Sequence, residues 1–475
     1  MTAATTFDPR EISDLPGPPG LPLLGNMLQL NPRTIHLTME AWSRRYGALF
    51  RARVIGRQVV VLSDSEAISA ALRARPDTFR RPAITAEVSA ELGGDPGLFL
   101  AEGDAWRQQR RMVMHGFSPA AVKAYFPRLR EVALRLGERW DTAVREQREI
   151  DLSDDMKRYA VDVVAGLAFG ADVNTLASGD SALQGHVDTV MAGVARRSLM
   201  PLPYWRWLRL PADRRLERSI AALRSAVDGF IARARGALAG DPALRAQPAN
   251  VLQAMLVAAD EAGSGVDDAA VAGNVSTMLL AGEDTTSSAL TWLIWLLVQH
   301  PAALARAREE VLRHAPDAAT MTPEQADALD YVEACALEAM RLKPPAPYIP
   351  LEALRETTVL GVRLPPGTLL WCVMRHDSVD AATVPGADRF DPERWLAAAN
   401  PARQVSQPFG AGARMCPGRY LSLMEMKVAM AMLLGRFDIV SARARSGAAP
   451  AEVMGFVMAP TPVSVTLRQR GRAAS

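Results

Sequence analysis

Hydrophobic residues recur with helical spacing over most of the chain, in segments rich in Ala, Leu, Arg and Glu. Breaks such as GGDPG and KPPAPYIP separate these segments. The longest helical pattern runs from about Asp267 to His300 and stops before Pro301. At about 1.5 Å per residue, such a helix would be roughly 50 Å long and cross a whole domain. We therefore expect it to run through the core.

Three segments instead alternate apolar and polar residues, as strands do. Residues 46–64 read as a hairpin that turns near Gly56 and Arg57, and the pattern returns at 355–375 and at 453–467. The resulting fold class is mainly α (α+β), with a helical body and a small antiparallel β-sheet region.

The chain shows no linker and no internal repeat across its 475 residues, so we expect a single domain over 1–475. Within it, residues 1–25 form an N-terminal arm whose proline-dense part, LPGPPGLPLLG, favours a stiff, extended backbone. The first 15 residues lack an apolar core, and the strongest apolar run, at 289–298, is shorter than the roughly 20 residues of a membrane span. We therefore expect no membrane anchor.

Composition narrows the class of protein. Hydrophobic residues make up 49% and charged residues 22% of the chain, as in a globular protein. Lys and Arg number 54 against 52 Asp and Glu, which is too even for wholesale nucleic-acid binding. The three cysteines lack CxxC spacing, which indicates a reducing, cytoplasmic location. Cys335 and Cys372 lie in apolar segments and are expected in the core.

The third cysteine, Cys416, lies in the turn-rich sequence FGAGARMCPGRY, just before a predicted helix that starts at Pro417. Backbone N–H groups at a helix N-terminus stabilise a thiolate, which is a metal ligand. A zinc site would need further cysteines or histidines nearby, and the six histidines are scattered. A single sulfur ligand therefore points to haem.

The sequence FGAGARMCPG resembles the haem-binding loop of the cytochrome P450 family, Phe-x-x-Gly-x-Arg-x-Cys-x-Gly. The matching residues are Phe409, Gly412, Arg414, Cys416 and Gly418. The resemblance implies that haem b is the cofactor and that Cys416 is the axial iron ligand. It also implies that Phe409 packs beside the cysteine and that Arg414 pairs with a haem propionate.

A second stretch, GDAWRQQRRMVMHGFS at 103–118, places Trp106 and Arg110 on one helix face. Taken alone, it could be an amphipathic surface helix. It resembles the family's Trp-x-x-x-Arg helix, which implies that Trp106 and Arg110 bind a haem propionate. His115 is expected to be a packed or surface residue and not an iron ligand.

Glu338 and Arg341 form one of several Glu-x-x-Arg pairs and are almost the only charges in the apolar helix VEACALEAMRL. They are therefore expected to be buried with further partners. By resemblance to the family's Glu-Arg-Arg cluster, Arg394 of FDPERW completes a structural triad. We interpret a second pair, Glu310 and Arg313, as an i,i+3 ion pair on a solvated helix face.

The longest helix contains LLAGEDTTSSALTW, a polar stretch between apolar flanks. A helix face turned to solvent would explain the hydroxyls but not the apolar residues on either side of them. Hydroxyls that bond to the carbonyl one turn back, together with Gly282, instead predict a locally opened helix. The stretch resembles the family's oxygen-activation motif through Ala281, Gly282, Asp284, Thr285 and Thr286. This implies that Thr285 hydrogen-bonds dioxygen, that Asp284 relays protons, and that Ala281 lies against the haem face.

The implied function is a monooxygenase that hydroxylates or epoxidises a hydrophobic small molecule, such as a fatty acid, terpenoid, steroid or polyketide-like compound. A haem-thiolate isomerase, dehydratase or peroxide-dependent hydroxylase would share the cysteine loop but typically alters the acid–alcohol pair. A haem sensor would be expected to carry a signalling or DNA-binding module, which the sequence does not show. By family analogy, the expected pocket residues are Leu98, Phe99, Tyr348, Ile349, Leu351, Phe456 and Val457.

The stretch after Cys416 is too short for a reductase domain, so electrons are expected from a separate ferredoxin or flavodoxin with its NAD(P)H-dependent reductase. Arg107, Arg111, Arg419 and Lys427 could form a basic docking patch for that acidic partner. We expect a cytoplasmic monomer that binds neither nucleic acid nor a membrane.

Overall fold

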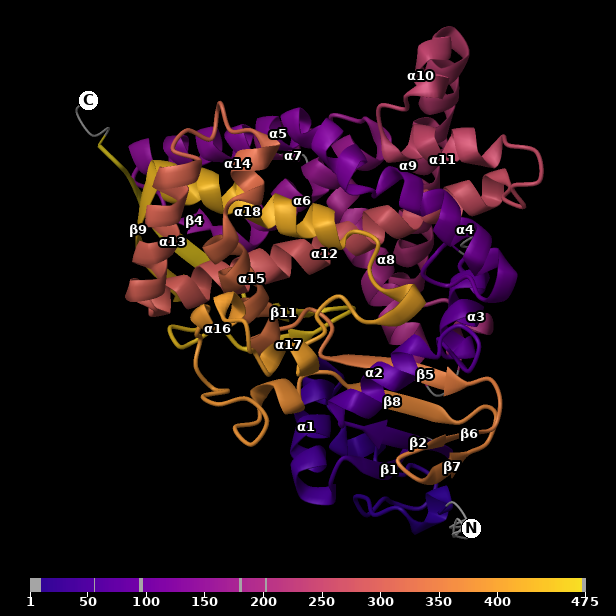
Figure 1. The fold of residues 1–475 in the computed structure, drawn as a ribbon. Helices are drawn as coiled ribbons and strands as arrows, with labels where there is room; N and C mark the ends of the chain where they lie inside the picture. The colour runs from indigo at the N-terminus through magenta and orange to yellow at the C-terminus, as the bar shows by residue number, and fades with distance from the viewer. Residues whose placement is uncertain (1–9, 55, 94–96, 179–181, 201–202, 472–475) are drawn as a thin grey trace, which may run out of the picture. The chain divides into compact units, whose positions relative to one another are not determined.

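The computed structural model describes residues 10–54, 56–93, 97–178, 182–200 and 203–471 (Figure 1). The chain divides into two compact units, each built from three segments. The first unit comprises residues 1–85, 346–388 and 401–415, and the second comprises 86–345, 389–400 and 416–475.

The first unit contains a five-stranded sheet in the order β1-β2-β8-β5-β3. Its β1–β2 hairpin has the predicted position and pairs Phe50 with Val61. Strands β2 and β8 pair in parallel, whereas the other neighbours are antiparallel, so the sheet is mixed and not purely antiparallel as expected. The strands are β1 (Leu49–Val54), β2 (Arg57–Leu62), β3 (Phe79–Arg80), β5 (Tyr348–Ala353) and β8 (Leu369–Val373), with a separate β6 (Thr357–Val359) and β7 (Val362–Leu364) hairpin.

The helices of the first unit and the sheet share a hydrophobic core that includes Val60, Leu72 and Leu370. Each fully buried side chain of this kind stabilises the fold by about 1.5–3 kcal/mol. The helices are α1 (Ile35–Tyr46), α2 (Ser65–Arg73) and α17 (Ala402–Val405), with short 3-10 helices η1 (Ile12–Asp14), η2 (Met27–Gln29), η3 (Pro32–Thr34), η5 (Asp377–Val379) and η6 (Gly412–Arg414).

The second unit is mostly helical. Its helices are α4 (Gly103–Gly116), α5 (Pro119–Arg145), α6 (Leu152–Phe169), α7 (Thr175–Ser178), α8 (Ala182–Leu199), η4 (Tyr204–Arg206), α9 (Pro211–Gly240), α10 (Pro242–Ala246), α11 (Val251–Ala259), α12 (Asp268–Gln299), α13 (Pro301–His314), α14 (Pro323–Asp327), α15 (Asp330–Leu342), α16 (Glu393–Leu396) and α18 (Arg419–Arg436). Helix α3 (Ala83–Glu91) begins in the last residues of the first unit and continues into the second.

Two small antiparallel sheets complete the second unit. Their strands are β4 (Ile150–Asp151), β9 (Phe437–Ala444) and β12 (Val463–Gln469) in one sheet, and β10 (Glu452–Met454) and β11 (Met458–Pro460) in the other. The predicted mainly α (α+β) fold class is confirmed.

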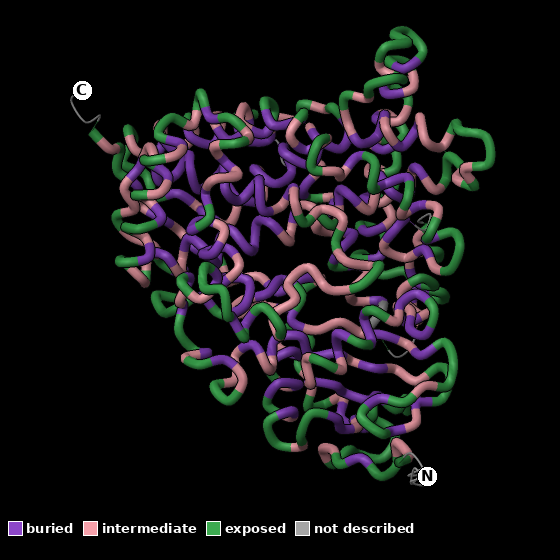
Figure 2. Tube along the Cα trace, in the orientation of Figure 1, coloured by how far each residue is buried: buried purple, intermediate pink, exposed green. Residues whose placement is uncertain are grey.

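Helix α12 is the predicted long core helix, and its ends agree with the prediction to within a residue. Asp267 caps its first turn by accepting a hydrogen bond from the backbone N–H of Ala270 at 2.8 Å. It packs against α6, α15 and α18, so that most of its length is buried (Figures 1 and 2). Trp292 and Leu293 in its second half are 2% and 0% exposed.

None of the described helices is by itself long and apolar enough to cross a membrane. Helices α12 and α13 meet those criteria only as a pair, and the chain bends by 114° between them.

Candidate functional site

Two residues, Pro417 and Gly418, separate Cys416 from α18, which begins two residues later than expected, at Arg419. The backbone N–H of Gly418 donates a hydrogen bond to the Cys416 sulfur, as predicted for a cysteine at a helix N-terminus. Burial nevertheless raises the pKa of the thiol above its usual value, although Gly418 and the Arg110 guanidinium lower it. The hydrogen bond at the helix N-terminus therefore lowers the thiol pKa, but not enough to offset burial. A coordinated metal ion would complete the deprotonation of the thiol.

Cys416 is an exposed residue, although protein atoms surround its thiol closely enough to raise the thiol pKa. A Cβ atom on Gly418 would lie 3.9 Å from this sulfur, so glycine keeps the approach to the thiol open. Among the described residues, Cys416 belongs to no group of His, Cys, Asp or Glu that could hold a metal ion. This donor set does not fit zinc but does fit a metal whose other ligands come from a porphyrin.

The preceding part of the cysteine loop, Phe409 to Arg414, belongs to the first unit. Gly412 has a positive φ of 72°, and a Cβ atom on it would lie 2.6 Å from the Cα of Arg73 in α2. Only glycine therefore lets η6 pack against α2. Phe409 and Arg414 are half-buried.

Helix α4 carries Trp106 and Arg110 at its predicted position. Trp106 is 5% exposed, and Arg110 is half-buried with its charge beside Cys416. Burial lowers the pKa of Arg110, and the Cys416 sulfur opposes this effect. A cation on α4 thus lies close to the sulfur, on the same side of the second unit, and His115 is exposed as expected.

Asn274 connects α12 with Leu98, which precedes α4, and with Gln109 in the middle of α4, and sequence reasoning missed it. Its Oδ1 accepts a hydrogen bond from the backbone N–H of Leu98 at 3.0 Å, and its Nδ2 donates to Gln109 Oε1 at 2.9 Å. An amide on an apolar helix was the available signal, because a buried amide needs partners.

The predicted polar stretch of α12 presents Ala281 and Thr285 one turn apart on one face. Ala281 is exposed and Thr285 is half-buried, although the flanking Leu279 and Glu283 are only 5% and 1% exposed. Open space therefore adjoins the helix at this face. Thr285 Oγ1 donates to the Ala281 carbonyl at 2.7 Å.

Two contacts fix this part of α12 within the second unit. Thr286 Oγ1 lies 3.3 Å from Ser422 Oγ of α18, which connects the motif to the helix that follows Cys416. A Cβ atom on Gly282 would lie 2.3 Å from Val164 Cγ2 of α6, so this glycine permits close helix packing. The helix continues unbroken through Gly282, and the expectation of a locally opened helix is wrong.

Asp284 pairs with a lysine that sequence analysis did not identify. Lys157 Nζ of α6 lies 3.3 Å from Asp284 Oδ1 and 2.9 Å from Asp188 Oδ1 of α8. Burial opposes the charge on Lys157, but Asp284 and Asp188 raise its pKa. Burial raises the pKa of Asp284, and Lys157 partly offsets that rise. The pair is therefore a half-buried acid held beside a lysine whose charge the two aspartates stabilise.

Glu283, next to Asp284, is a buried acid whose two carboxyl oxygens have no hydrogen-bond partner among the described residues. Its carboxyl lies within 4.8 Å of those of Asp188 and Asp284. Burial, followed by repulsion from these two acids, raises its pKa to about 9, with Lys157 opposing. Glu283 is therefore neutral at pH 7.

We expect Glu283→Gln to remove a pH dependence from folding stability. The folded-state pKa of about 9 lies above the ordinary value of 4.5. The native protein therefore loses stability as the pH rises from the ordinary value towards the folded-state value. Relative to the variant, the free energy of unfolding of the wild type should fall by about 1–3 kcal/mol between pH 6 and 8.

Chemical unfolding at the two pH values measures this difference. Glu261→Gln, which changes an exposed acid, should show a constant difference from the wild type. A Glu283→Gln curve parallel to the wild-type curve would show that Glu283 is ionised in the folded protein.

The predicted cluster of Glu338, Arg341 and Arg394 is assembled in the structure. Glu338 and Arg341 are both 0% exposed, and Arg341 Nε donates to Glu338 Oε2 at 2.8 Å. Arg394 Nε donates to Glu338 Oε1 at 3.0 Å, and Trp395 Nε1 donates to Glu338 Oε2 at 2.8 Å. The buried charges thus gain the additional hydrogen bonds that offset desolvation.

The interpretation of Glu310 and Arg313 as a pair is wrong. The Glu310 carboxylate accepts hydrogen bonds from the backbone N–H groups of Tyr331 and Val332 at 2.7 and 2.9 Å, and so caps the start of α15. Arg313 pairs with Glu309 instead. Free N–H groups at a helix start bind a carboxylate more strongly than an exposed arginine does.

The predicted pocket residues have different environments. Leu351 is 0% exposed in the core of the first unit and does not line a pocket, which corrects that prediction. Within the second unit, the Phe99 and Phe456 rings lie 5.6 Å apart between centroids. The other predicted residues are buried or half-buried: Leu98, Tyr348, Ile349 and Val457.

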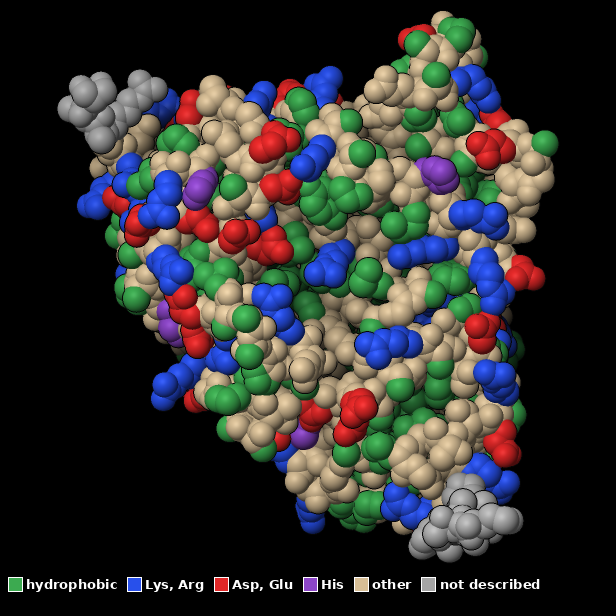
Figure 3. Space-filling model, viewed as in Figure 1, with side chains coloured by type: hydrophobic (Ala, Val, Ile, Leu, Met, Phe, Trp, Pro, Cys, Tyr) green, Lys and Arg blue, Asp and Glu red, His purple; other side chains and the backbone are tan. Residues whose placement is uncertain are grey.

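The proposed basic docking patch needs one correction. Lys427 is 5% exposed and pairs with Glu333 at 2.6 Å, so its charge is not presented to a partner. Arg107, Arg111 and Arg419 are exposed, although Arg107 also pairs with Asp104. Basic and acidic side chains are interspersed over the face in Figure 3, as the even charge balance predicts.

Comparison with known proteins identifies the family of the chain. A family model for cytochrome P450 matches residues 15–467. A self-sufficient cytochrome P450 monooxygenase from Aspergillus niger is 27% identical over 91% of this chain, which spans 41% of that relative's length. Cyclooctatin synthase from Streptomyces melanosporofaciens is 32% identical over 88% of both chains. Cyclooctat-9-en-7-ol 5-monooxygenase of the same organism is 29% identical over 89% of this chain and 88% of the relative.

The family match covers nearly the whole chain, and it includes Cys416, the acid–alcohol pair of α12 and the buried Glu338 cluster. The chain therefore belongs to the cytochrome P450 family of haem b-dependent monooxygenases.

Proposed function

We propose that the protein uses O2 and two electrons to hydroxylate or epoxidise a hydrophobic small molecule. One observation carries the proposal: within the second unit, α12 presents Thr285 and Asp284 beside the helix that follows Cys416, and the Thr286–Ser422 contact connects the two helices. A cysteine ligand and an acid–alcohol pair are what reductive oxygen activation requires.

Haem would be held mainly by the cysteine loop and α4. Cys416 would supply the sulfur ligand, and Gly418 keeps the approach to that sulfur open. The roles of Phe409 and Gly412 in the loop stay predictions from the family resemblance. Arg110 and Trp106 would bind a propionate, and Ala281 would leave room at the haem face. The pairing of Arg414 with a propionate stays a prediction from the family resemblance. The bound haem would supply the oxygen activation and the oxidation of the substrate C–H or C=C bond.

Protons would reach the site through Asp284 and Thr285. Burial raises the pKa of Asp284, so its carboxyl holds a proton to higher pH than an ordinary aspartic acid, and Lys157 holds the side chain in place. The Thr285 hydroxyl, which rests on the Ala281 carbonyl, would rotate to donate a hydrogen bond at the accessible face of α12. Glu338, Arg341 and Arg394 would support the fold and take no part in the chemistry.

Cytochrome P450 enzymes use O2 and a redox partner. We propose a ferredoxin or flavodoxin with its NAD(P)H-dependent reductase, which would dock on exposed Arg107, Arg111 and Arg419. The single domain over 1–475, the monomeric state and the cytoplasmic location stay predictions.

The substrate is proposed to be hydrophobic. The Phe99–Phe456 pair provides an aromatic, half-buried surface in the second unit. One relative acts, by its name, on cyclooctat-9-en-7-ol, which is a hydroxylated alkene. A terpenoid, fatty acid, steroid or polyketide-like compound would suit such a surface, and a ligand screen for the low-to-high-spin shift of the haem would identify the class.

Thr285→Ala should uncouple reductant consumption from product formation, because the hydroxyl that guides proton delivery is lost. We expect product per NADPH to fall about ten-fold while NADPH oxidation continues. The measurement is the ratio of product to NADPH with surrogate ferredoxin and reductase.

Two variants control for structure. Thr277→Ala removes an equivalent hydrogen bond on the same helix, to the Gly273 carbonyl at 2.8 Å, and should stay coupled. Thr285→Ser keeps the hydroxyl and should retain most of the coupling. Unchanged coupling in Thr285→Ala would contradict the proton relay, and equal turnover with peroxide alone would favour a peroxide-dependent hydroxylase.

A further inference from the structure

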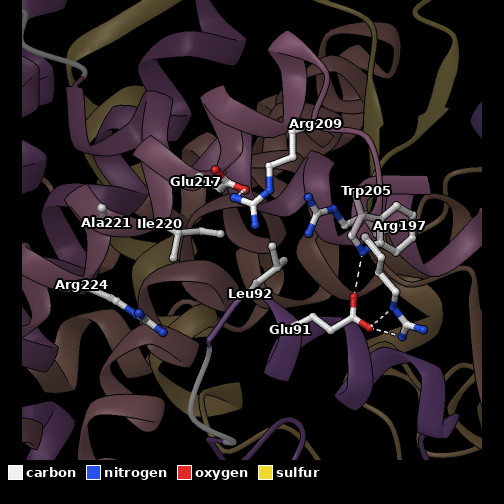
Figure 4. Close-up of a pocket in the computed structure, with 10 residues that line it drawn as sticks. Glu91, Leu92, Arg197, Trp205, Arg209, Glu217, Ile220, Ala221 and Arg224 are labelled. Carbon is white, nitrogen blue, oxygen red and sulfur yellow. Dashed lines mark hydrogen bonds and ion pairs between the residues drawn. The ribbon is translucent and has the colours of Figure 1, made fainter. Parts of the chain in front are cut away.

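A polar pocket of about 420 Å³ lies in the second unit, apart from every residue assigned to the haem site (Figure 4). Its wall comes from the end of α3, the end of α8, the 3-10 helix η4 and the first half of α9. Four arginines and two glutamates contribute to its lining.

The two glutamates are already engaged by two of the arginines. Arg206 Nε donates to Glu91 Oε1 at 2.9 Å, and Trp205 Nε1 donates to Glu91 Oε2 at 2.8 Å. Donation by Trp205, followed by Arg206, lowers the pKa of Glu91, so this carboxylate stays charged. Arg209 pairs with Glu217 at 2.6 Å. Arg197 and Arg224 therefore give the lining its positive excess.

Arg197 is built into the protein and not simply solvated. It is 5% exposed, its guanidinium lies 4.9 Å from the centre of the Trp205 ring, and it donates to Asp213 at 3.1 Å. Asp213 is shared with Arg196, so one carboxylate faces two guanidinium groups. The Arg197 Nε is buried and has no hydrogen-bond partner among the described residues, so the charge of this guanidinium is only partly compensated by Asp213.

Arg224 is the second available cation. It forms no hydrogen bond or ion pair with another described residue, and its side chain reaches Gly93, where a Cβ atom would lie 2.1 Å from Nη2. Figure 4 shows the guanidinium groups of Arg209 and Arg224 on either side of Ile220. With Leu92 and Ala221, Ile220 supplies an apolar surface between the charges. Such a pocket suits a ligand with one charged end and a hydrocarbon chain.

We propose that this pocket binds the anionic group of an amphipathic small molecule, a carboxylate or a phosphate, at Arg224, with its hydrocarbon part against Leu92 and Ile220, and that Arg197 adds positive charge to the same lining. Guanidinium groups match both oxyanions through paired N–H donors, whereas an alcohol offers no charge to them. The inference goes beyond the proposed function, because binding at this pocket needs no chemistry at Cys416.

Isothermal titration calorimetry of the haem-loaded protein with sodium octanoate, octyl phosphate and 1-octanol tests the proposal. We expect at least one of the two anions to bind about ten-fold more tightly than the alcohol, as one charge-assisted hydrogen bond would provide. Tighter binding of octanoate would identify a carboxylate ligand, and tighter binding of octyl phosphate would identify a phosphate ligand.

Variants localise the effect. Arg224→Gln should weaken anion binding about ten-fold and leave octanol binding unchanged. Arg197→Gln serves as a second variant and should act in the same direction. Arg218→Gln, an exposed arginine of α9 outside the pocket, should change neither. Equal binding of octanol and both anions, or anion binding that Arg224→Gln does not weaken, would overturn the proposal whether or not the protein is a monooxygenase.

Discussion

Cys416→Ala is expected to abolish NADPH-driven product formation and to leave the purified protein with little or no haem. Cys416 is the only exposed cysteine among the described residues, since Cys335 and Cys372 are both 0% exposed. Among the described residues, no group of side chains that could hold a metal ion contains a histidine or a cysteine. No such group could therefore take the place of Cys416. Without the sulfur, the iron would lose its one bond to the protein.

Haem content, measured as absorbance per protein after purification, checks this result. Cys335→Ala is the matched control, because it removes a buried thiol whose pKa burial holds well above its usual value. The control should retain haem and activity at a small cost in stability. Full haem content in Cys416→Ala would mean that another residue ligates the iron.

Glu338→Gln should be the most destabilising of the single substitutions considered. It leaves Arg341 buried without its carboxylate and weakens the hydrogen bonds from Arg394 and Trp395. Removing one partner of a buried ion pair typically costs about 3–5 kcal/mol. The free energy of unfolding, measured by chemical denaturation of the haem-loaded protein, should fall by that amount.

A control lies on the neighbouring helix α16. Glu393 pairs with Arg306 at a half-exposed position, so Glu393→Gln should cost less than about 1 kcal/mol. If Glu338→Gln were no more costly than this control, the cluster would not contribute to stability as described.

Features contained within one segment were predictable from the sequence. The ends of α12, the β1–β2 hairpin and the position of α4 follow from periodicity, prolines and capping residues that lie together in the chain. The burial of Glu338 and Arg341 was predictable for the same reason, because the apolar residues around them belong to the same helix.

Features that depend on packing between segments were not predictable. Lys157, Asp188 and Asp284 come from three separate helices, and no local pattern shows which of their faces meet. Leu351 was misplaced because side chains of a strand alternate between faces, and only the paired sheet shows that it faces the core with Ala353. Gly282 was expected to open the helix locally. Its role in the structure is to let α6 approach α12 closely, which only the packing of the two helices shows.

The central claim is that the Cys416 sulfur, as a thiolate, binds haem iron. Its most direct test is the absorption spectrum of the reduced, carbon monoxide-bound wild-type protein. We predict the strongly red-shifted band that is characteristic of a haem with a cysteine thiolate ligand, and its absence in Cys416→Ala but not in Cys335→Ala. A spectrum typical of histidine-ligated haem, or a purified protein that takes up no haem, would contradict the account.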